Sequence, residues 1–188
     1  MTTVISPHAA EQPGLDLPTR RLLDASLLLG PLAYLALDCA YSARGWWDGP
    51  TGAAHTLVAA LYGVTALKLV SINRGRLQSV LLVVAVLGIV GNAGVGTDTV
   101  HVALGGNDLF QESGPANVFK MMGFFFPLTL LVAAIGLRRR TPSWWAPLLA
   151  VGAVLFPVAH VNNISWLAIT DAVIVLLALG SLTRVLRD

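Results

Sequence analysis

The stretch Ile89–His101, IVGNAGVGTDTVH, decides how this chain is interpreted, because it combines a membrane-like setting with polar side chains. It closes a long apolar segment, where only lipid-compatible residues are expected. Instead it carries Asn92, Asp98 and His101, separated by glycines. Ionisable residues inside a membrane segment are costly and are therefore functional candidates. The stretch predicts a polar pocket near one membrane surface.

The composition places the whole chain among polytopic membrane proteins. Of its 188 residues, 55% are hydrophobic and only 12% are charged, against about 25% charged in soluble domains. The mean hydropathy is +0.72. A net charge of +2, with the arginines at helix ends, indicates no nucleic-acid partner. One cysteine, Cys39, excludes an internal disulfide and a cysteine-based metal cluster.

Six apolar segments are each long enough to cross a hydrocarbon core of about 30 Å as a helix. Alternating strands, which a barrel requires, are absent from the pattern. We therefore expect an all-α, multi-pass integral membrane protein with six transmembrane helices. The expected helices are residues 22–41, 53–72, 77–102, 118–137, 144–161 and 164–186.

The arginines predict the orientation of these helices. They precede the first helix, lie between the second and third and between the fourth and fifth, and follow the sixth. The positive-inside rule makes this side cytoplasmic, so both termini are expected inside the cell membrane. Residues 1–19 form a polar cytoplasmic tail, residues 20–188 one membrane domain, and residues 105–117 an outer loop. The arginines are Arg20, Arg21, Arg74, Arg76, Arg138, Arg139, Arg140, Arg184 and Arg187.

Two charged residues lie near the inner side and have simple interpretations. Asp24 lies close to Arg20 and Arg21 and is four residues after Arg20, so we expect it to pair with these arginines. Lys68 is near the inner end of the second helix and can extend its ammonium group to the surface.

Placed on this topology, the remaining polar residues share one depth in the outer half of the membrane. This convergence of residues that are distant in sequence is the main functional signal. A buried carboxyl group can carry a proton or act as a general acid. The candidate catalytic residues are Asp171, Asp98, His101, His160 and His55, and the candidate ligand-binding residues are Asp38, Asn92, Asn162, Trp166, Tyr34 and Phe125.

Structural roles compete with these assignments. Gly88, Asn92 and Gly96 recur every four residues, so a neighbouring helix can approach closely and bond to Asn92. Asp171 can be a neutral acid bonded to a neighbouring helix. Each histidine can bind water or a carbonyl group at the membrane surface.

Several functions remain open. The favoured one is binding of a lipidic or isoprenoid molecule, or acid–base chemistry on it. The alternatives are a proton-coupled transporter, a non-catalytic subunit of a membrane complex, and a metal- or haem-binding protein. The histidines have no recognised metal-binding spacing, so no metal ligand and no cofactor is assigned. Membrane lipid, a hydrophobic small molecule and a second copy of the chain are the partners considered.

Overall fold

The computed structural model describes residues 16–185, except for the side chains of residues 116, 117, 119 and 120. Between these bounds it contains helices and loops and no strand. Most of the predicted polar tail and Arg187 lie outside the described residues. The elements are α1 (Leu17–Arg44), α2 (Gly49–Ile72), α3 (Arg76–Ala103), the short 3₁₀ helix η1 (Gly114–Ala116), α4 (Asn117–Gly123), α5 (Phe125–Leu137), α6 (Trp145–Val161) and α7 (Ser165–Val185).

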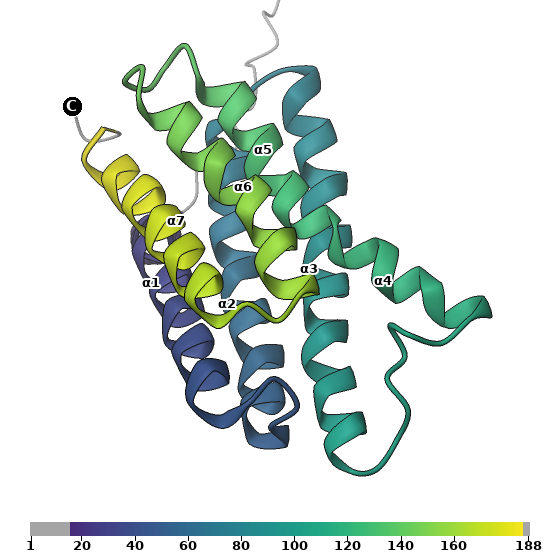
Figure 1. Cartoon of the computed structure of the whole chain (residues 1–188). Coiled ribbons are helices and arrows are strands. Elements are labelled where there is room, and N and C mark those ends of the chain that lie inside the picture. Colours follow the sequence, from purple (N-terminus) through teal and green to yellow (C-terminus); the bar gives the residue numbers. More distant parts are fainter. Residues whose placement is uncertain (1–15, 186–188) are drawn as a thin grey trace, which may run out of the picture.

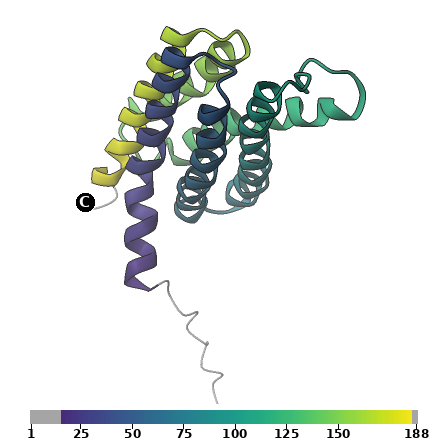
Figure 2. The same ribbon diagram turned by 90° about the horizontal axis from the view of Figure 1, so that it is seen from below.

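The long helices form a closed ring in chain order. Each of α1, α2, α3, α5, α6 and α7 packs against the next, and α7 returns to α1. Consecutive helices of the ring run antiparallel; short loops join all of them except α3 and α5, which are connected by residues 104–124, and α4 in this connection extends away from the bundle (Figures 1 and 2). The loops at 73–75 and 138–144 therefore share one end of the bundle, here called the basic end. The loops at 45–48, 104–113 and 162–164 lie toward the opposite end, here called the cavity end.

Four helices, α1, α2, α3 and α7, are long and apolar enough to span a membrane. Two further apolar stretches, Met121–Leu137 and Trp145–Val161, are shorter. The expected helix at 118–137 is interrupted, because α4 ends at Gly123 and α5 begins at Phe125. Pro127 lies in the first turn of α5, where its missing N–H group costs no helical bond. This proline therefore starts a helix, whereas Pro157 lies inside α6.

The helix boundaries follow local capping chemistry. The Asp16 side chain accepts a bond from the Thr19 backbone N–H group at 3.0 Å and begins α1. Asp48 caps α2 in the same way, through the backbone N–H of Thr51 at 2.9 Å. Gly45 ends α1 with φ of 97°, a conformation that residues with a Cβ atom rarely adopt. These side-chain bonds satisfy N–H groups that a helix start leaves free.

Glycines bring α2, α3 and the α4–α5 segment close together. A Cβ atom on Gly96 would lie 2.7 Å from the carbonyl oxygen of Gly52, and one on Gly88 would lie 2.8 Å from the backbone of Phe126. Contacts this short leave no room for a side chain, so the row of small residues on α3 serves close helix packing. Asn92 lies in the same row and is buried.

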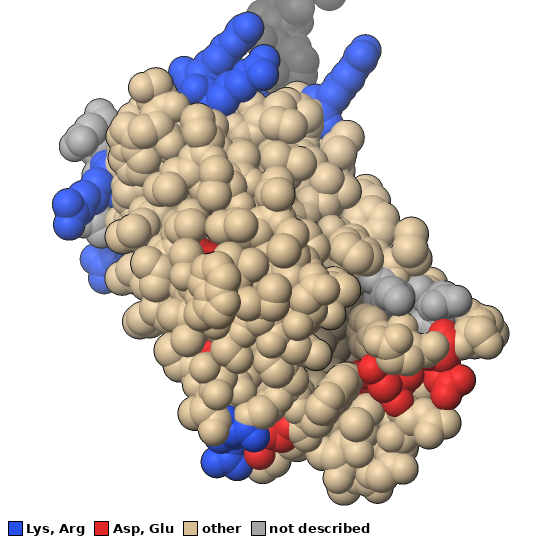
Figure 3. All heavy atoms as spheres, in the orientation of Figure 1, with Lys and Arg blue, Asp and Glu red and all other residues tan. Residues whose placement is uncertain are grey.

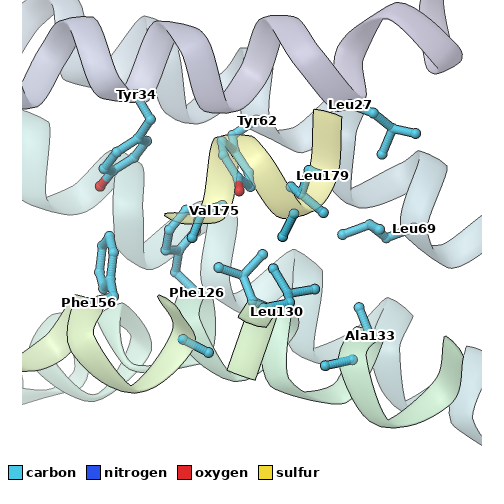
Figure 4. Packing of buried hydrophobic residues seen from close by; sticks show 14 of the residues in the cluster. Leu27, Tyr34, Tyr62, Leu69, Phe126, Leu130, Ala133, Phe156, Val175 and Leu179 are labelled. Carbon is cyan, nitrogen blue, oxygen red and sulfur yellow. The ribbon is translucent and has the colours of Figure 1, made fainter. Parts of the chain in front are cut away.

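The core changes character along the bundle axis. Toward the basic end it is aliphatic, whereas Tyr34, Phe126 and Phe156 bring aromatic rings toward the cavity end (Figure 4). Figure 4 shows Tyr34 and Phe156 at one end of this cluster and Leu27 and Leu69 at the other. Trp145 is fully buried in the aliphatic part and donates from Nε1 to the Ala178 carbonyl oxygen at 2.7 Å. The basic end of the bundle is thus filled with side chains.

Charges are divided between the two ends. Figure 3 shows most Lys and Arg side chains gathered at one end and the acidic side chains mostly toward the other. Lys68 pairs with Asp24 at 2.7 Å, so the expected pairing of Asp24 with Arg20 and Arg21 was wrong. Asp24 lies on α1 and Lys68 on α2, and these two helices pack against each other. The Arg140 guanidinium donates to the Ile72 carbonyl oxygen at the end of α2.

Candidate ligand-binding site

A cavity of about 190 Å³ lies at the cavity end of the bundle. Its walls come from α1, α2, α3, α5 and α6, and the loop after α3 covers part of it. Figure 3 shows the surface hollowed where the acidic side chains of this loop meet the bundle. The lining is mainly apolar and aromatic, with a few polar groups, as in small-molecule sites. It includes Tyr34, Tyr41, Trp46, Trp47, His55, Asn92, Val95, Asp98, Thr99, Asp108, Phe110, Phe124, Phe156 and His160.

Four side chains from three helices form a hydrogen-bonded network at one side of this cavity. The Asn92 Oδ1 atom accepts from the Tyr34 hydroxyl at 3.0 Å and lies 3.0 Å from His55 Nε2. The Tyr41 hydroxyl lies 3.0 Å from His55 Nδ1. All four side chains are buried. The network therefore ties α1, α2 and α3 together.

Asn92 Oδ1 can accept hydrogen bonds but cannot donate them, and this determines where the hydrogen atoms of the network lie. Because that oxygen can only accept, His55 Nε2 carries hydrogen and donates to it. In the neutral imidazole, His55 Nδ1 then accepts from the Tyr41 hydroxyl. Asn92 Nδ2 is left without a hydrogen-bond partner among the described residues. A buried amide donor without an acceptor is costly, so this atom marks a place for a ligand or a water molecule.

An acid–imidazole pair lies beside the network. His160 Nε2 lies 3.2 Å from Asp38 Oδ1, and His160 Nδ1 lies 2.9 Å from the Phe156 carbonyl oxygen. The carbonyl accepts only, so Nδ1 carries hydrogen. The contact between His160 Nε2 and Asp38 Oδ1 therefore holds one proton, which either the histidine or the aspartate carries. His160 borders the cavity, and Asp38 is 1% exposed behind it.

Asp171 lies one layer deeper than the cavity. It borders a separate void of about 10 Å³, together with Tyr34, Tyr62 and Phe156. Tyr34 and Phe156 line both spaces, so their rings separate Asp171 from the larger cavity. Asp171 Oδ1 and the Tyr62 hydroxyl have no partner among residues 16–185. The void is at the lower limit for a single water molecule.

The rim of the cavity is acidic. Asp98 Oδ1 accepts from the backbone N–H of Leu109 at 3.1 Å and so holds the loop at 104–113 against α3. Asp108 lies beside Asp98 and also lines the cavity. Nearby, the Arg44 guanidinium binds both carboxylate oxygens of Asp48, at 2.8 and 3.0 Å. This arginine, together with Thr51, holds the pKa of Asp48 well below its usual range.

The structure gathers about half of the sequence-predicted site residues. Tyr34, His55, Asn92, Asp98 and His160 line the cavity, and Asp38 is bonded to His160. The other candidates lie elsewhere. His101, Asn162 and Trp166 are exposed, Phe124 lines the cavity in place of Phe125, and Asp171 is buried outside it.

Metal coordination has little geometric support. Within residues 16–185, no three His, Cys, Asp or Glu side chains lie close enough together to hold an ion. His55 uses both ring nitrogens in the network, and His160 uses both in its own bonds.

The chain matches no protein-family model, no curated protein and no solved structure. The chemistry of the cavity must therefore be inferred from its own geometry.

Sequence reasoning missed three residues that shape the cavity: Tyr41, Trp46 and Phe156. The signal for Tyr41 was present, since Tyr34, Asp38 and Tyr41 are spaced by four and three and so share one helix face. Trp46 follows α1 and stacks on Tyr41 with ring centroids 5.3 Å apart. That contact depends on the turn at Gly45, which no spacing rule predicts.

Proposed function

We propose that this protein is a six-span cell-membrane protein that binds a lipidic or other amphipathic small molecule in the cavity. In this proposal both termini and the basic end are cytoplasmic, and the cavity end faces outward. The arginines of the basic end support this orientation through the positive-inside rule. Their exposure at the bundle end fits that assignment.

One observation carries the binding proposal: Asn92, which borders a largely aromatic cavity, has an Nδ2 atom without a hydrogen-bond partner among the described residues. Aromatic walls suit the apolar body of a ligand, and a few fixed polar groups orient it. A ligand with an acceptor atom satisfies Asn92 Nδ2. The Tyr34 and His55 bonds hold the Asn92 side chain in place for that contact.

Acid–base chemistry, if the protein is an enzyme, is assigned to the Asp38–His160 pair. It holds a proton at the cavity wall, and its carboxylate orients the imidazole, as in other catalytic pairs. Asp171 does not border the cavity, so first contact with a ligand is assigned to His160. The filled aliphatic core at the basic end favours binding over transport by a single protomer, because transport needs access from both sides.

Native mass spectrometry of protein released from mild detergent tests the binding proposal. The wild-type protein is expected to retain a small molecule, and Val95→Trp, which fills the cavity from α3, is expected to lose it. Val90→Trp is the matched control, because Val90 lies on the same helix with 47% of its surface exposed. Equal retention by both variants, or a bare polypeptide in every sample, would contradict the proposal.

A further inference from the structure

The charge around the cavity is one-sided. Asp98 and Asp108 lie together at the rim, and Asp38 lies behind His160. None of the described lining residues is Lys or Arg. Arg44, near the same end, is held by both carboxylate oxygens of Asp48. The rim of the cavity therefore presents the neighbouring carboxyl groups of Asp98 and Asp108, with no Lys or Arg among the described lining residues.

Aromatic rings complete the walls around these acids. Trp46 stacks on Tyr41 and meets His160 edge-on, with centroids 5.7 Å apart. Trp47, Phe110 and Phe124 also line the space. The faces of Trp, Tyr and Phe rings attract cations, most strongly where water is excluded. Aromatic walls with carboxyl groups and without Lys or Arg suit a bound organic cation.

A separate observation points to a ligand in the same space. Asn92 is 3% exposed, and its Nδ2 atom has no partner among the residues that the structure describes. An acceptor atom on a ligand that reaches this donor would supply the hydrogen bond that it lacks. Asp98 follows Asn92 by six residues in α3, which corresponds to a rise of about 9 Å. The cavity thus has a hydrogen-bond donor at the level of Asn92 and a carboxyl group, that of Asp98, about 9 Å further along α3 toward the cavity end.

We propose that the ligand is an organic cation with an apolar body and a carbonyl or hydroxyl oxygen at the end away from its charge. The inference rests on the proposed function, since it names the ligand class of the same cavity. The oxygen accepts from Asn92 Nδ2, the apolar body lies among the aromatic rings, and the cation faces Asp98 and Asp108.

Other ligand classes fit the same residues less well. An anionic headgroup, such as a phosphate, would meet two carboxylates with no cation among the described lining residues. A neutral lipid would leave Asp98 and Asp108, which lie together at the rim, with no cation between them. Two neighbouring carboxyl groups without a cation are stabilised by taking up a proton, whereas a cation stabilises both as carboxylates.

Three probes of nearly the same shape distinguish the effect of the ligand's charge on binding from the effect of its shape. The cation is (4-acetylbenzyl)trimethylammonium, which carries its oxygen and its charge at opposite ends of one ring. Its neutral isostere is 4-neopentylacetophenone, and the anion is 4-acetylbenzylsulfonate. Binding is measured by isothermal titration calorimetry of the detergent-solubilised protein, with protein-free micelles as the blank. The cation is expected to bind about tenfold or more tightly than the neutral isostere, and the anion is expected not to bind.

Replacing each rim aspartate with asparagine, which has the same shape without the charge, tests whether these residues cause the preference for the cation. Asp98→Asn and Asp108→Asn keep a side-chain oxygen to accept from Leu109 and Phe110, which the two carboxylates bind in the wild type. Each is expected to weaken cation binding about tenfold and to leave the neutral isostere within about twofold, which also reports an intact cavity. Glu112→Gln is the control, because Glu112 lies on the same loop, is exposed and does not line the cavity.

The outcomes distinguish this inference from the proposed function. Equal affinity for the cation and the neutral isostere overturns the cation inference and leaves a ligand-binding cavity. Wild-type cation affinity in both Asp variants also overturns it. If no probe binds while native mass spectrometry shows a retained molecule, the inference fails and the proposed function stands. If no probe binds and no molecule is retained, both fail.

Discussion

Replacing Asn92 with leucine is expected to abolish ligand retention and to lower the free energy of unfolding by about 2 to 6 kcal/mol. Leucine is similar in size, but it removes the oxygen that accepts from Tyr34 and His55. Two buried donors then lose their acceptor, at about 1 to 3 kcal/mol each. The measurements are detergent-phase unfolding and native mass spectrometry of the same preparation.

The matched control for this variant is Thr97→Leu. Thr97 is exposed on the same helix, and its hydroxyl donates only to the Ala93 carbonyl of its own helix. Its replacement is expected to change stability by less than about 0.5 kcal/mol. An Asn92→Leu protein that is less stable but still retains its ligand would show that the network serves helix packing alone. Unchanged stability would contradict the network itself.

Gly96→Ala is expected to destabilise the protein by about 1 to 3 kcal/mol, although a methyl group is the smallest possible addition. The new Cβ atom would lie 2.7 Å from the Gly52 carbonyl oxygen and from the Thr56 backbone nitrogen. Both contacts are with backbone atoms of α2, so α2 and α3 must move apart. That movement separates His55 from Asn92, so ligand retention is expected to fall as well.

Gly180→Ala is the control for this prediction, because it is expected to change the stability of the protein in the opposite direction. A Cβ atom there meets only the Leu28 Cδ1 atom, at an ordinary 3.4 Å. Alanine favours a helix over glycine by up to about 1 kcal/mol, so this variant is expected to match or exceed wild-type stability. Unfolding midpoints of the two variants in one detergent provide the comparison. Equal effects of the two substitutions would mean that α2 and α3 are not in close contact.

The depth of the polar residues could be predicted from the sequence, because the length of an apolar segment fixes how far each residue lies from its ends. This is why His55, Asn92 and His160 were expected together, and all three border the cavity. The third and sixth segments were placed within one residue of α3 and α7, except for Leu186, which lies outside the described range.

Rotation about each helix axis could not be predicted in the same way. In a membrane the lipid-facing side of a helix is as apolar as its packed side, so no amphipathic pattern distinguishes them. Trp166 lies at the expected end of the bundle but is 69% exposed, and His101 is also exposed. The interruption before Pro127 and the bond from Leu109 to Asp98 depend on tertiary packing, which spacing rules do not contain.

Cysteine accessibility in intact cells tests the central claim, a cavity open to the outside of a membrane-spanning bundle, most directly. A membrane-impermeant thiol reagent would be applied to three single-cysteine variants made in a Cys39→Ser background. Asn107→Cys in the outer loop and Val95→Cys in the cavity lining are expected to react in intact cells, and Thr141→Cys at the basic end only after permeabilisation. Reaction at Thr141 without permeabilisation, with Asn107 and Val95 protected, would contradict the account.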